Sequence, residues 1–146
     1  MTINLPQPTL SSTLSRDGRP VWKIDALACA EGDVFTLTFE DAAQRWRQGI
    51  WLAVDGQLAV DDVESPQLVL WRDTAPRVVN LTVRRTDDRL LRLYNVWDSG
   101  RGRRMESQSA TSGMLRQDLA DGYRYRCTDI GPDPDFSALT FSLTRA

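Results

Sequence analysis

The residues best suited to chemistry gather in one polar stretch, residues 95–113, between two predicted pairs of strands. Gly100 and Gly102 in this stretch allow backbone conformations and close approaches that other residues do not. Long loops in compact domains are often functional, so we expect a polar pocket or lip here. The candidate ligand-binding residues are Tyr94, Trp97, Asp98, Arg101, Arg103, Glu106 and Gln108. The alternative is a solvated loop whose charges pair with one another.

Aromatic side chains in and near this stretch indicate the kind of ligand. Trp97, Tyr94, Trp71 and Trp51 are candidate stacking platforms for sugar rings or other planar groups. Large aromatic residues at inward strand positions usually belong to the core, and we favour that interpretation for Trp51 and Trp97. The first hypothesis is therefore a small soluble binding module for a polar small molecule, such as a carbohydrate.

Histidine is absent from the sequence, which excludes a Ser-His-Asp triad, a Cys-His pair and a histidine-based metal centre. An enzyme of this composition would use carboxylates as its acid and base, as in glycoside chemistry. The candidate pair is Glu106 with either Asp98 or Asp129. We keep this enzyme as the second hypothesis.

A calcium site is the one cofactor hypothesis that the sequence suggests. Asp129, Asp133 and Asp135 place three carboxylates within residues 128–136, where backbone carbonyls would complete the shell of a hard cation. The spacing matches no defined calcium loop, and the prolines and glycine among these residues favour a rigid turn instead.

The numbers of acidic and basic residues indicate which partners to expect. The net charge is −2, and Lys23 is the only lysine, so all other basic residues are arginines. We do not expect nucleic acid as a partner, because acidic residues are interspersed among the arginines and the overall balance is acidic. The third hypothesis is pairing with another chain, including formation of a homo-oligomer, through the strand that ends at Ala146.

The location expected from the sequence is the cytoplasm. No apolar run reaches the length of a membrane span or of a signal peptide, so no membrane partner is expected. Cys29 and Cys127 are interpreted as small buried apolar residues; a disulfide between them is the alternative.

The elements that must position these residues are predicted to be short strands. Alternation of apolar and polar residues over 34–40, 77–85, 89–97, 123–128 and 139–143 is typical of half-buried strands. Turn residues predict hairpins at Asp17-Gly18, Asp55-Gly56, Thr86-Asp87-Asp88 and Asp121-Gly122. One short helix is expected over residues 42–48, with Trp46 turned inward; a turn or a bulged strand is the alternative.

These elements predict an all-β protein with one domain over residues 11–146, preceded by an extended lead-in over residues 1–10. We favour a two-sheet antiparallel β-sandwich of the jelly-roll type, because the connections at 25–34, 60–67 and 128–138 are long enough to cross between sheets. An up-and-down β-barrel is the alternative, favoured by the number of tight hairpins.

Overall fold

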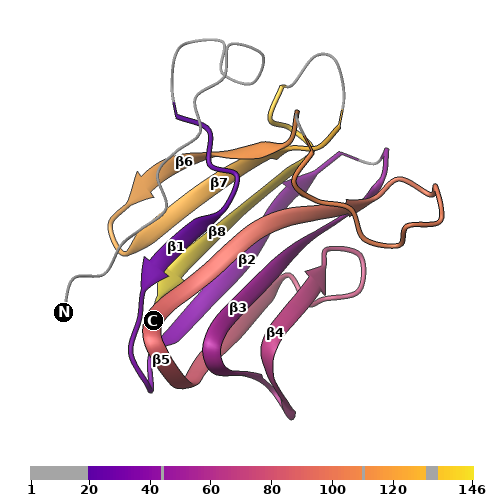
Figure 1. Ribbon diagram of the computed structural model, residues 1–146. Helices are drawn as coiled ribbons and strands as arrows, with labels where there is room; N and C mark the ends of the chain where they lie inside the picture. The colour runs from indigo at the N-terminus through magenta and orange to yellow at the C-terminus, as the bar shows by residue number, and fades with distance from the viewer. Residues whose placement is uncertain (1–19, 44, 110, 131–134) are drawn as a thin grey trace.

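The computed structural model describes residues 20–43, 45–109, 111–130 and 135–146 (Figure 1). All regular secondary structure within them is β-strand, which confirms the all-β prediction. The strands are β1 (Asp25–Ala28), β2 (Val34–Ala42), β3 (Arg47–Val60), β4 (Val63–Trp71), β5 (Val78–Asp98), β6 (Gly113–Leu119), β7 (Gly122–Thr128) and β8 (Leu139–Arg145). The predicted lead-in over residues 1–10 and the predicted hairpin at Asp17-Gly18 lie outside the described residues.

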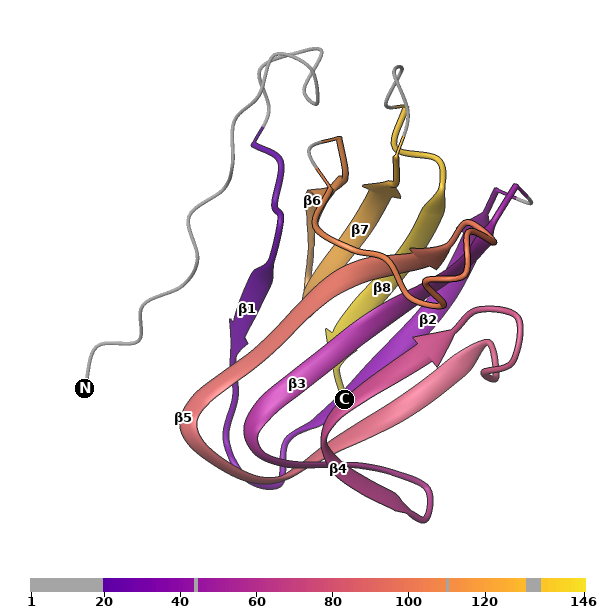
Figure 2. The ribbon, with the colours of Figure 1, turned by 45° about the vertical axis from the view of Figure 1, so that its right-hand side comes forward.

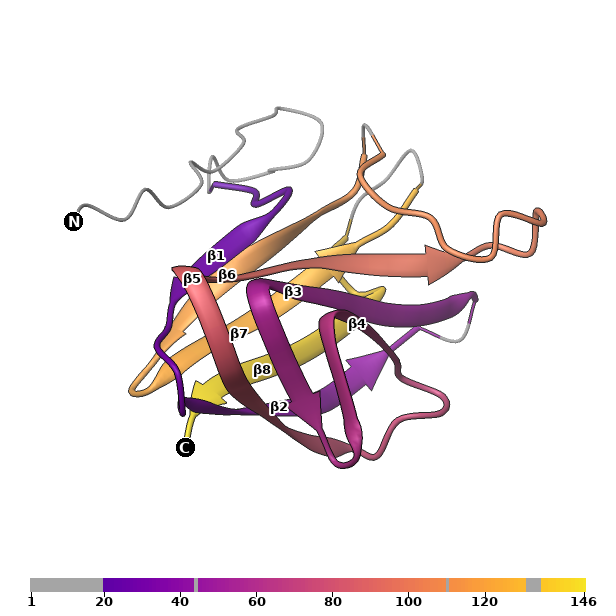
Figure 3. The same ribbon diagram turned by 60° about the horizontal axis from the view of Figure 1, so that its bottom comes forward.

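The strands form an antiparallel sheet in the order β4-β3-β5-β2-β8-β7-β6, and β1 is hydrogen-bonded to β5 beside this order. The long strand β5 curves the sheet. Its residues 78–82 pair with β2, whereas its residues 90–93 pair with β1. Because the two parts of β5 have different neighbours, the sheet curls around the core, as Figures 1 and 3 show. In the described part of the chain, no helix has the length and apolar character needed to cross a membrane.

The sheet is not closed into a barrel by a continuous ladder. Along the edge where β1 stands next to β6 (Figure 2), the described residues form one backbone bridge, between Trp22, which precedes β1, and Met114 of β6. Its two N–H to O distances are 2.8 and 2.9 Å. Beyond this bridge, β1 pairs only with β5, so β1 and β6 leave a gap in the backbone hydrogen bonding.

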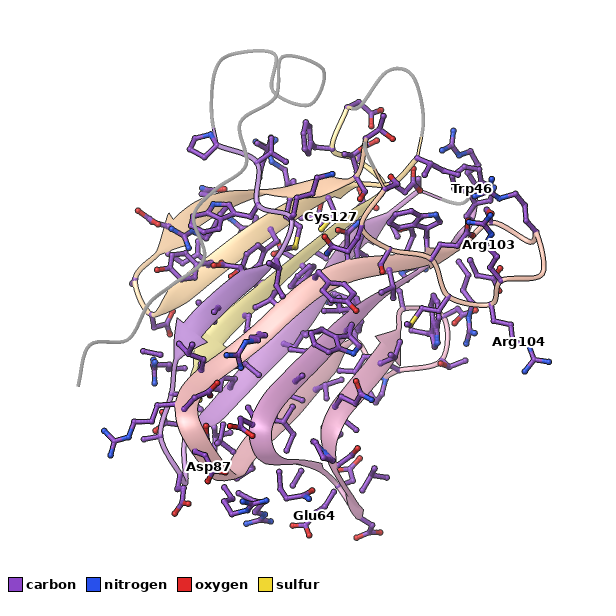
Figure 4. The ribbon with its side chains drawn as sticks, viewed as in Figure 1. Trp46, Glu64, Asp87, Arg103, Arg104 and Cys127 are labelled. Atoms are coloured by element: carbon purple, nitrogen blue, oxygen red, sulfur yellow. The ribbon has the colours of Figure 1, made fainter. Side chains whose placement is uncertain are left out.

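Two predicted hairpins are wrong, and both lie at one bend of the sheet. Asp55-Gly56 is inside the continuous strand β3, and Thr86-Asp87-Asp88 is inside β5. The two segments face each other, with Gly56 opposite Thr86, and the register shifts beside this pair. Asp87 is labelled at this bend in Figure 4. The residue types that form tight turns also form β-bulges, and here they bend the paired strands without ending them.

Contacts at the bend explain why these residues occur there. A Cβ on Gly56 would lie 2.0 Å from the carbonyl oxygen of Arg85, so only glycine allows β3 to approach β5 this closely. In β5, Arg89 has a φ of +61°, which is uncommon for a residue other than glycine. Its N–H donates to the hydroxyl of Thr86 at 3.0 Å. The side chain of Thr86 therefore accepts a hydrogen bond from a backbone N–H in the bend of β5.

Other predicted elements are confirmed. β6 and β7 form the predicted hairpin, with Leu119 opposite Gly122, so that it turns at Ala120-Asp121, one residue before the predicted Asp121-Gly122. β2 and β8 follow the predicted alternation. The expected helix over residues 42–48 is not formed by the described residues there; β2 ends at Ala42 and β3 begins at Arg47. Trp46 is not turned into the core; it is half-buried with the guanidinium of Arg45 3.8 Å from its ring.

The core lies on the inner face of the curled sheet. Alternate residues of β2, β3, β5, β7 and β8 point into it, as the period of a strand requires. Its largest fully buried side chains are Trp97, Tyr125, Phe35, Phe141, Leu37, Ile50, Leu52, Leu58, Leu81, Leu91 and Leu93. Cys29 and Cys127 are free thiols in this core, so the disulfide alternative is not realised.

Candidate functional site

The loop that follows β5 covers a group of buried polar side chains at one end of the core. Gln48, Asn95, Glu106 and Asp129 are each less than 9% exposed. They come from β3, β5, the loop and the residue after β7. Buried polar groups at strand ends are stable only where they are hydrogen-bonded, so the partners of each one decide whether the group can also bind a ligand.

Glu106 forms hydrogen bonds with other residues of the loop and with the end of β5. Its backbone pairs with that of Trp97, and its carboxylate accepts hydrogen bonds from the N–H and the hydroxyl of Ser99 at 2.7 and 2.6 Å, and one from Arg101. Burial of this carboxylate acts to raise its pKa, but the hydrogen bonds from Ser99 and Arg101 outweigh it and lower the pKa of Glu106 to about 2. Glu106 is therefore ionised at neutral pH and acts as an acceptor.

Asp129 joins β7 to β3. Its carboxylate accepts a hydrogen bond from the amide nitrogen of Gln48 at 2.8 Å and one from Arg45 at 3.0 Å. Burial raises the pKa of Asp129, and the contacts with Gln48 and Arg45 oppose this shift. Nearby, the side-chain amide of Asn95 donates to the carbonyl of Thr128 at 3.1 Å. These bonds fasten the three strands together at this end of the sheet.

The structure brings some of the predicted loop residues together, but mainly as partners of one another. Arg101 binds Glu106, Asp98 accepts from the N–H of Gly100 at 2.9 Å, and Gln108 donates to the carbonyl of Lys23 at 2.7 Å. Trp97 is 1% exposed, so its ring is not accessible to a ligand. Arg103 is exposed at the periphery of the loop (Figure 4).

The predicted aromatic platforms lie on the outer face of the sheet, except for Trp97. The rings of Trp51 and Tyr94 stack on each other with centroids 4.4 Å apart, so Trp51 is not part of the core as we favoured. Trp71 covers Gly49, and the guanidinium of Arg47 lies 4.4 Å from its ring. The three half-buried rings therefore already contact groups of the protein itself.

The predicted calcium ligands are only partly described. Asp129 is bound by Gln48 and Arg45 as above, and a carboxylate oxygen of Asp135 accepts from the N–H of Ser137 at 3.1 Å. Asp133 lies outside the described residues. Across the ranges that the structure covers, no group of three or more Cys, Asp or Glu side chains is placed to hold a metal ion.

A cavity that the sequence did not indicate lies at the opposite end of β6, beside its turn into β7. It has a volume of about 590 Å³, within the range of small-molecule sites. It is lined by Ala26, Leu27, Ala28, Phe35, Asp118, Leu119, Ala120, Asp121, Gly122, Tyr123, Leu143 and Arg145. The floor includes the core residues Phe35 and Leu143. The cavity therefore opens where β1 and β6 lack a backbone ladder.

A buried ion pair, which we call the Asp25 clamp, holds this edge together next to the cavity. Asp25 of β1 is fully buried and accepts from the hydroxyl of Tyr125 at 2.7 Å and from the guanidinium of Arg116 at 3.2 Å. The guanidinium lies 4.1 Å from the ring of Trp22 and 4.4 Å from that of Tyr123. Burial, together with the charge of Asp25, raises the pKa of Tyr125 well above its usual value, so its hydroxyl stays a donor.

The rim of the cavity is polar. Asp118 and Asp121 are exposed at the β6–β7 turn. Arg145, from the end of β8, donates to Asp33 at 2.8 Å and also to the carbonyl of Ala28. The cavity thus combines an apolar floor with charged groups at its mouth, which is the arrangement of many small-molecule sites.

Comparison with known proteins finds no family model, no curated protein and no solved structure that matches this chain.

Proposed function

We propose that the protein binds a small molecule with an apolar body in the cavity between β1 and the β6–β7 turn. The observation that carries this proposal is the cavity itself, about 590 Å³ in volume and floored by core residues such as Phe35 and Leu143. Burial of apolar ligand surface contributes about 25 cal/mol for each Å² removed from water. A ligand that reaches the floor gains this contribution.

This proposal keeps the binding function expected from the sequence but changes the site and the ligand. In the loop after Trp97, the carboxylate of Glu106 is occupied by Ser99 and Arg101, and the ring of Trp97 is only 1% exposed, which favours the cavity over the loop. Of the carboxylates considered for an enzyme, Glu106 and Asp129 are both less than 9% exposed and enclosed by donors, and Asp98 accepts from the N–H of Gly100. These contacts favour binding over carboxylate-dependent catalysis.

We also propose that the protein works in a reducing compartment such as the cytoplasm. Cys29 and Cys127 are both free and buried, and burial raises the pKa of both thiols. Thiols of this kind are poor nucleophiles, and unpaired cysteines are typical of reducing compartments.

The test is titration of the full chain with N-phenylnaphthylamine, a neutral apolar fluorophore whose emission rises on leaving water. We expect saturable enhancement with one site per chain. The variant Ala120→Trp places a large side chain at the mouth of the cavity, at an exposed position of the turn, and should abolish the enhancement. The matched control is Ala30→Trp, which is also exposed but does not line the cavity.

Circular dichroism of both variants checks that they fold, because a misfolded chain also binds apolar dyes. Equal enhancement in the wild type and in folded Ala120→Trp would show that the dye binds elsewhere, and the proposal would be wrong.

A further inference from the structure

We infer that the ligand of this cavity is an amphiphilic cation, with an apolar body on the floor and a positively charged group at the rim beside Asp118 and Asp121. The inference rests on the proposed function and adds the chemical class of the ligand. The charged groups around the mouth of the cavity support it.

The acidic groups at the rim have no neutralising partner in the part of the chain that the structure describes. Asp118 and Asp121 are exposed, and neither carboxylate forms a hydrogen bond or an ion pair with another side chain among the residues that the structure describes. Both belong to the β6–β7 turn region and line the same cavity. They therefore place two negative charges at one side of its mouth.

The basic groups near the rim are already paired. The guanidinium of Arg145 donates to Asp33 and to the carbonyl of Ala28. The guanidinium of Arg116 lies 3.2 Å from both oxygens of the fully buried Asp25. Each arginine charge is thus offset by one carboxylate, and the net charge that the described residues present to a ligand at the mouth is that of Asp118 and Asp121.

The position of these carboxylates relative to the floor sets the shape of the ligand. Asp118 is the register partner of Tyr123, so the two side chains stand on the same face of the hairpin. Phe35 and Leu143 lie deeper, in the core. A molecule that fills the cavity with its apolar part and keeps its charged group in water has that group next to Asp118 and Asp121. An anionic group at the same place would be repelled.

Because the two carboxylates are exposed, their effect on affinity is moderate. Exposed ion pairs are weak individually, so the pair should favour a cation over a neutral group by about three- to tenfold. This preference should fall as salt is added, because the Debye length is about 10 Å at 0.1 M salt and about 3 Å at 1 M.

The experiment compares three ligands with the same apolar tail: octyltrimethylammonium, octanol and octyl sulfate. Each is titrated below its micelle concentration against wild-type protein loaded with N-phenylnaphthylamine, and displacement of the fluorophore gives its affinity. We expect octyltrimethylammonium to bind about three- to tenfold more tightly than octanol, and octyl sulfate to bind more weakly than octanol.

The double variant Asp118→Asn/Asp121→Asn should bind octyltrimethylammonium and octanol equally while binding the fluorophore like the wild type. The matched control is Asp55→Asn/Asp62→Asn, which changes the net charge by the same amount at exposed positions outside the cavity. This control should keep the preference for the cation.

The outcomes separate the two proposals. If neither the fluorophore nor any octyl ligand binds the wild type, the proposed function is wrong and the inference falls with it. If the ligands bind but the cation has no advantage over octanol, the function stands and the inference is overturned. It is also overturned if the control variant loses the preference as fully as Asp118→Asn/Asp121→Asn does, because the effect would then follow net charge alone.

Discussion

Replacing Arg116 with methionine (Arg116→Met) tests the Asp25 clamp that joins β1 to β6 and β7. Methionine keeps an apolar side chain between the rings of Trp22 and Tyr123 but removes the guanidinium 3.2 Å from the carboxylate of Asp25. Asp25 is fully buried, and its carboxylate would retain the hydroxyl of Tyr125 and the N–H of Ala26 as donors.

The magnitude follows from the burial of the pair. Removing one partner of a buried ion pair costs about 3–5 kcal/mol, because the other charge is left without compensation. The side chain of Arg116 is 21% exposed, whereas that of Asp25 is not exposed at all, so water replaces the lost cation only in part. We expect the free energy of unfolding to fall by about 3 kcal/mol, toward the lower end of this range. Domains of this kind have about 5–15 kcal/mol of stability, so the variant should still fold.

Urea unfolding, followed by fluorescence of the five tryptophans, measures the change. The control is Arg85→Met, the same substitution in an exposed pair with Asp87, where both side chains are more than half exposed. Exposed pairs contribute about 0–1 kcal/mol, so the control should lose less than about 1 kcal/mol.

The double variant Asp25→Asn/Arg116→Met makes the test sharper. It leaves no unpaired charge in the core, so it should be more stable than Arg116→Met alone, although it carries one more substitution. The reasoning is refuted if the double variant is less stable than Arg116→Met, or if Arg116→Met costs no more than Arg85→Met.

Two further predictions concern the bend and the loop. Gly56→Ala should lower the free energy of unfolding by about 3 kcal/mol, because its Cβ would lie 2.0 Å from the carbonyl of Arg85. The control Gly100→Ala meets no atom within 4 Å and carries only the strain of φ +80°, about 1–2 kcal/mol; equal losses in urea unfolding would contradict the close approach. Glu106→Gln should destabilise the protein at neutral pH by about 1–3 kcal/mol. Since the folded pKa of Glu106 is depressed to about 2 from 4.5, its contribution is present above about pH 4.5 and is lost as the pH falls toward about 2. The difference between wild type and Glu106→Gln should therefore shrink over this range, and a constant difference would exclude the ionised acceptor.

Local alternation in the sequence is enough to predict single strands and tight hairpins. β2, β7 and β8 follow the predicted pattern, and the β6–β7 hairpin turns within one residue of the predicted Asp121-Gly122. The pattern does not distinguish a turn from a bulge, because both use glycine and short polar residues. Gly56 lies where the backbone of β3 approaches that of β5. A local pattern cannot show this approach, because the partner residues are about thirty positions further along the chain.

For the loop after Trp97, the sequence predicts a polar pocket or lip and leaves open the alternative that its charges pair with one another; Glu106 and Arg101 pair in this way. The structure pairs the backbones of Trp97 and Glu106, which the sequence did not indicate. Whether Glu106 faces a ligand or binds Ser99 and Arg101 is decided by the conformation of the loop. The burial of Trp97, in contrast, is predicted by its inward strand position, and the structure confirms it.

The cavity could not be predicted because it depends on the bend in β3 and β5. Its lining comes from β1, β2, the β6–β7 turn and β8, which are brought together only because residues 90–93 of β5 pair with β1 while residues 78–82 pair with β2. Had Thr86-Asp87-Asp88 formed the predicted hairpin, the two parts of β5 would pair with each other and these partners would be lost. The same residues that were interpreted as a turn therefore set β1 beside β6 without a ladder. Gly56→Ala, by disturbing this bend, should weaken fluorophore binding as well as stability, whereas Gly100→Ala should leave binding unchanged.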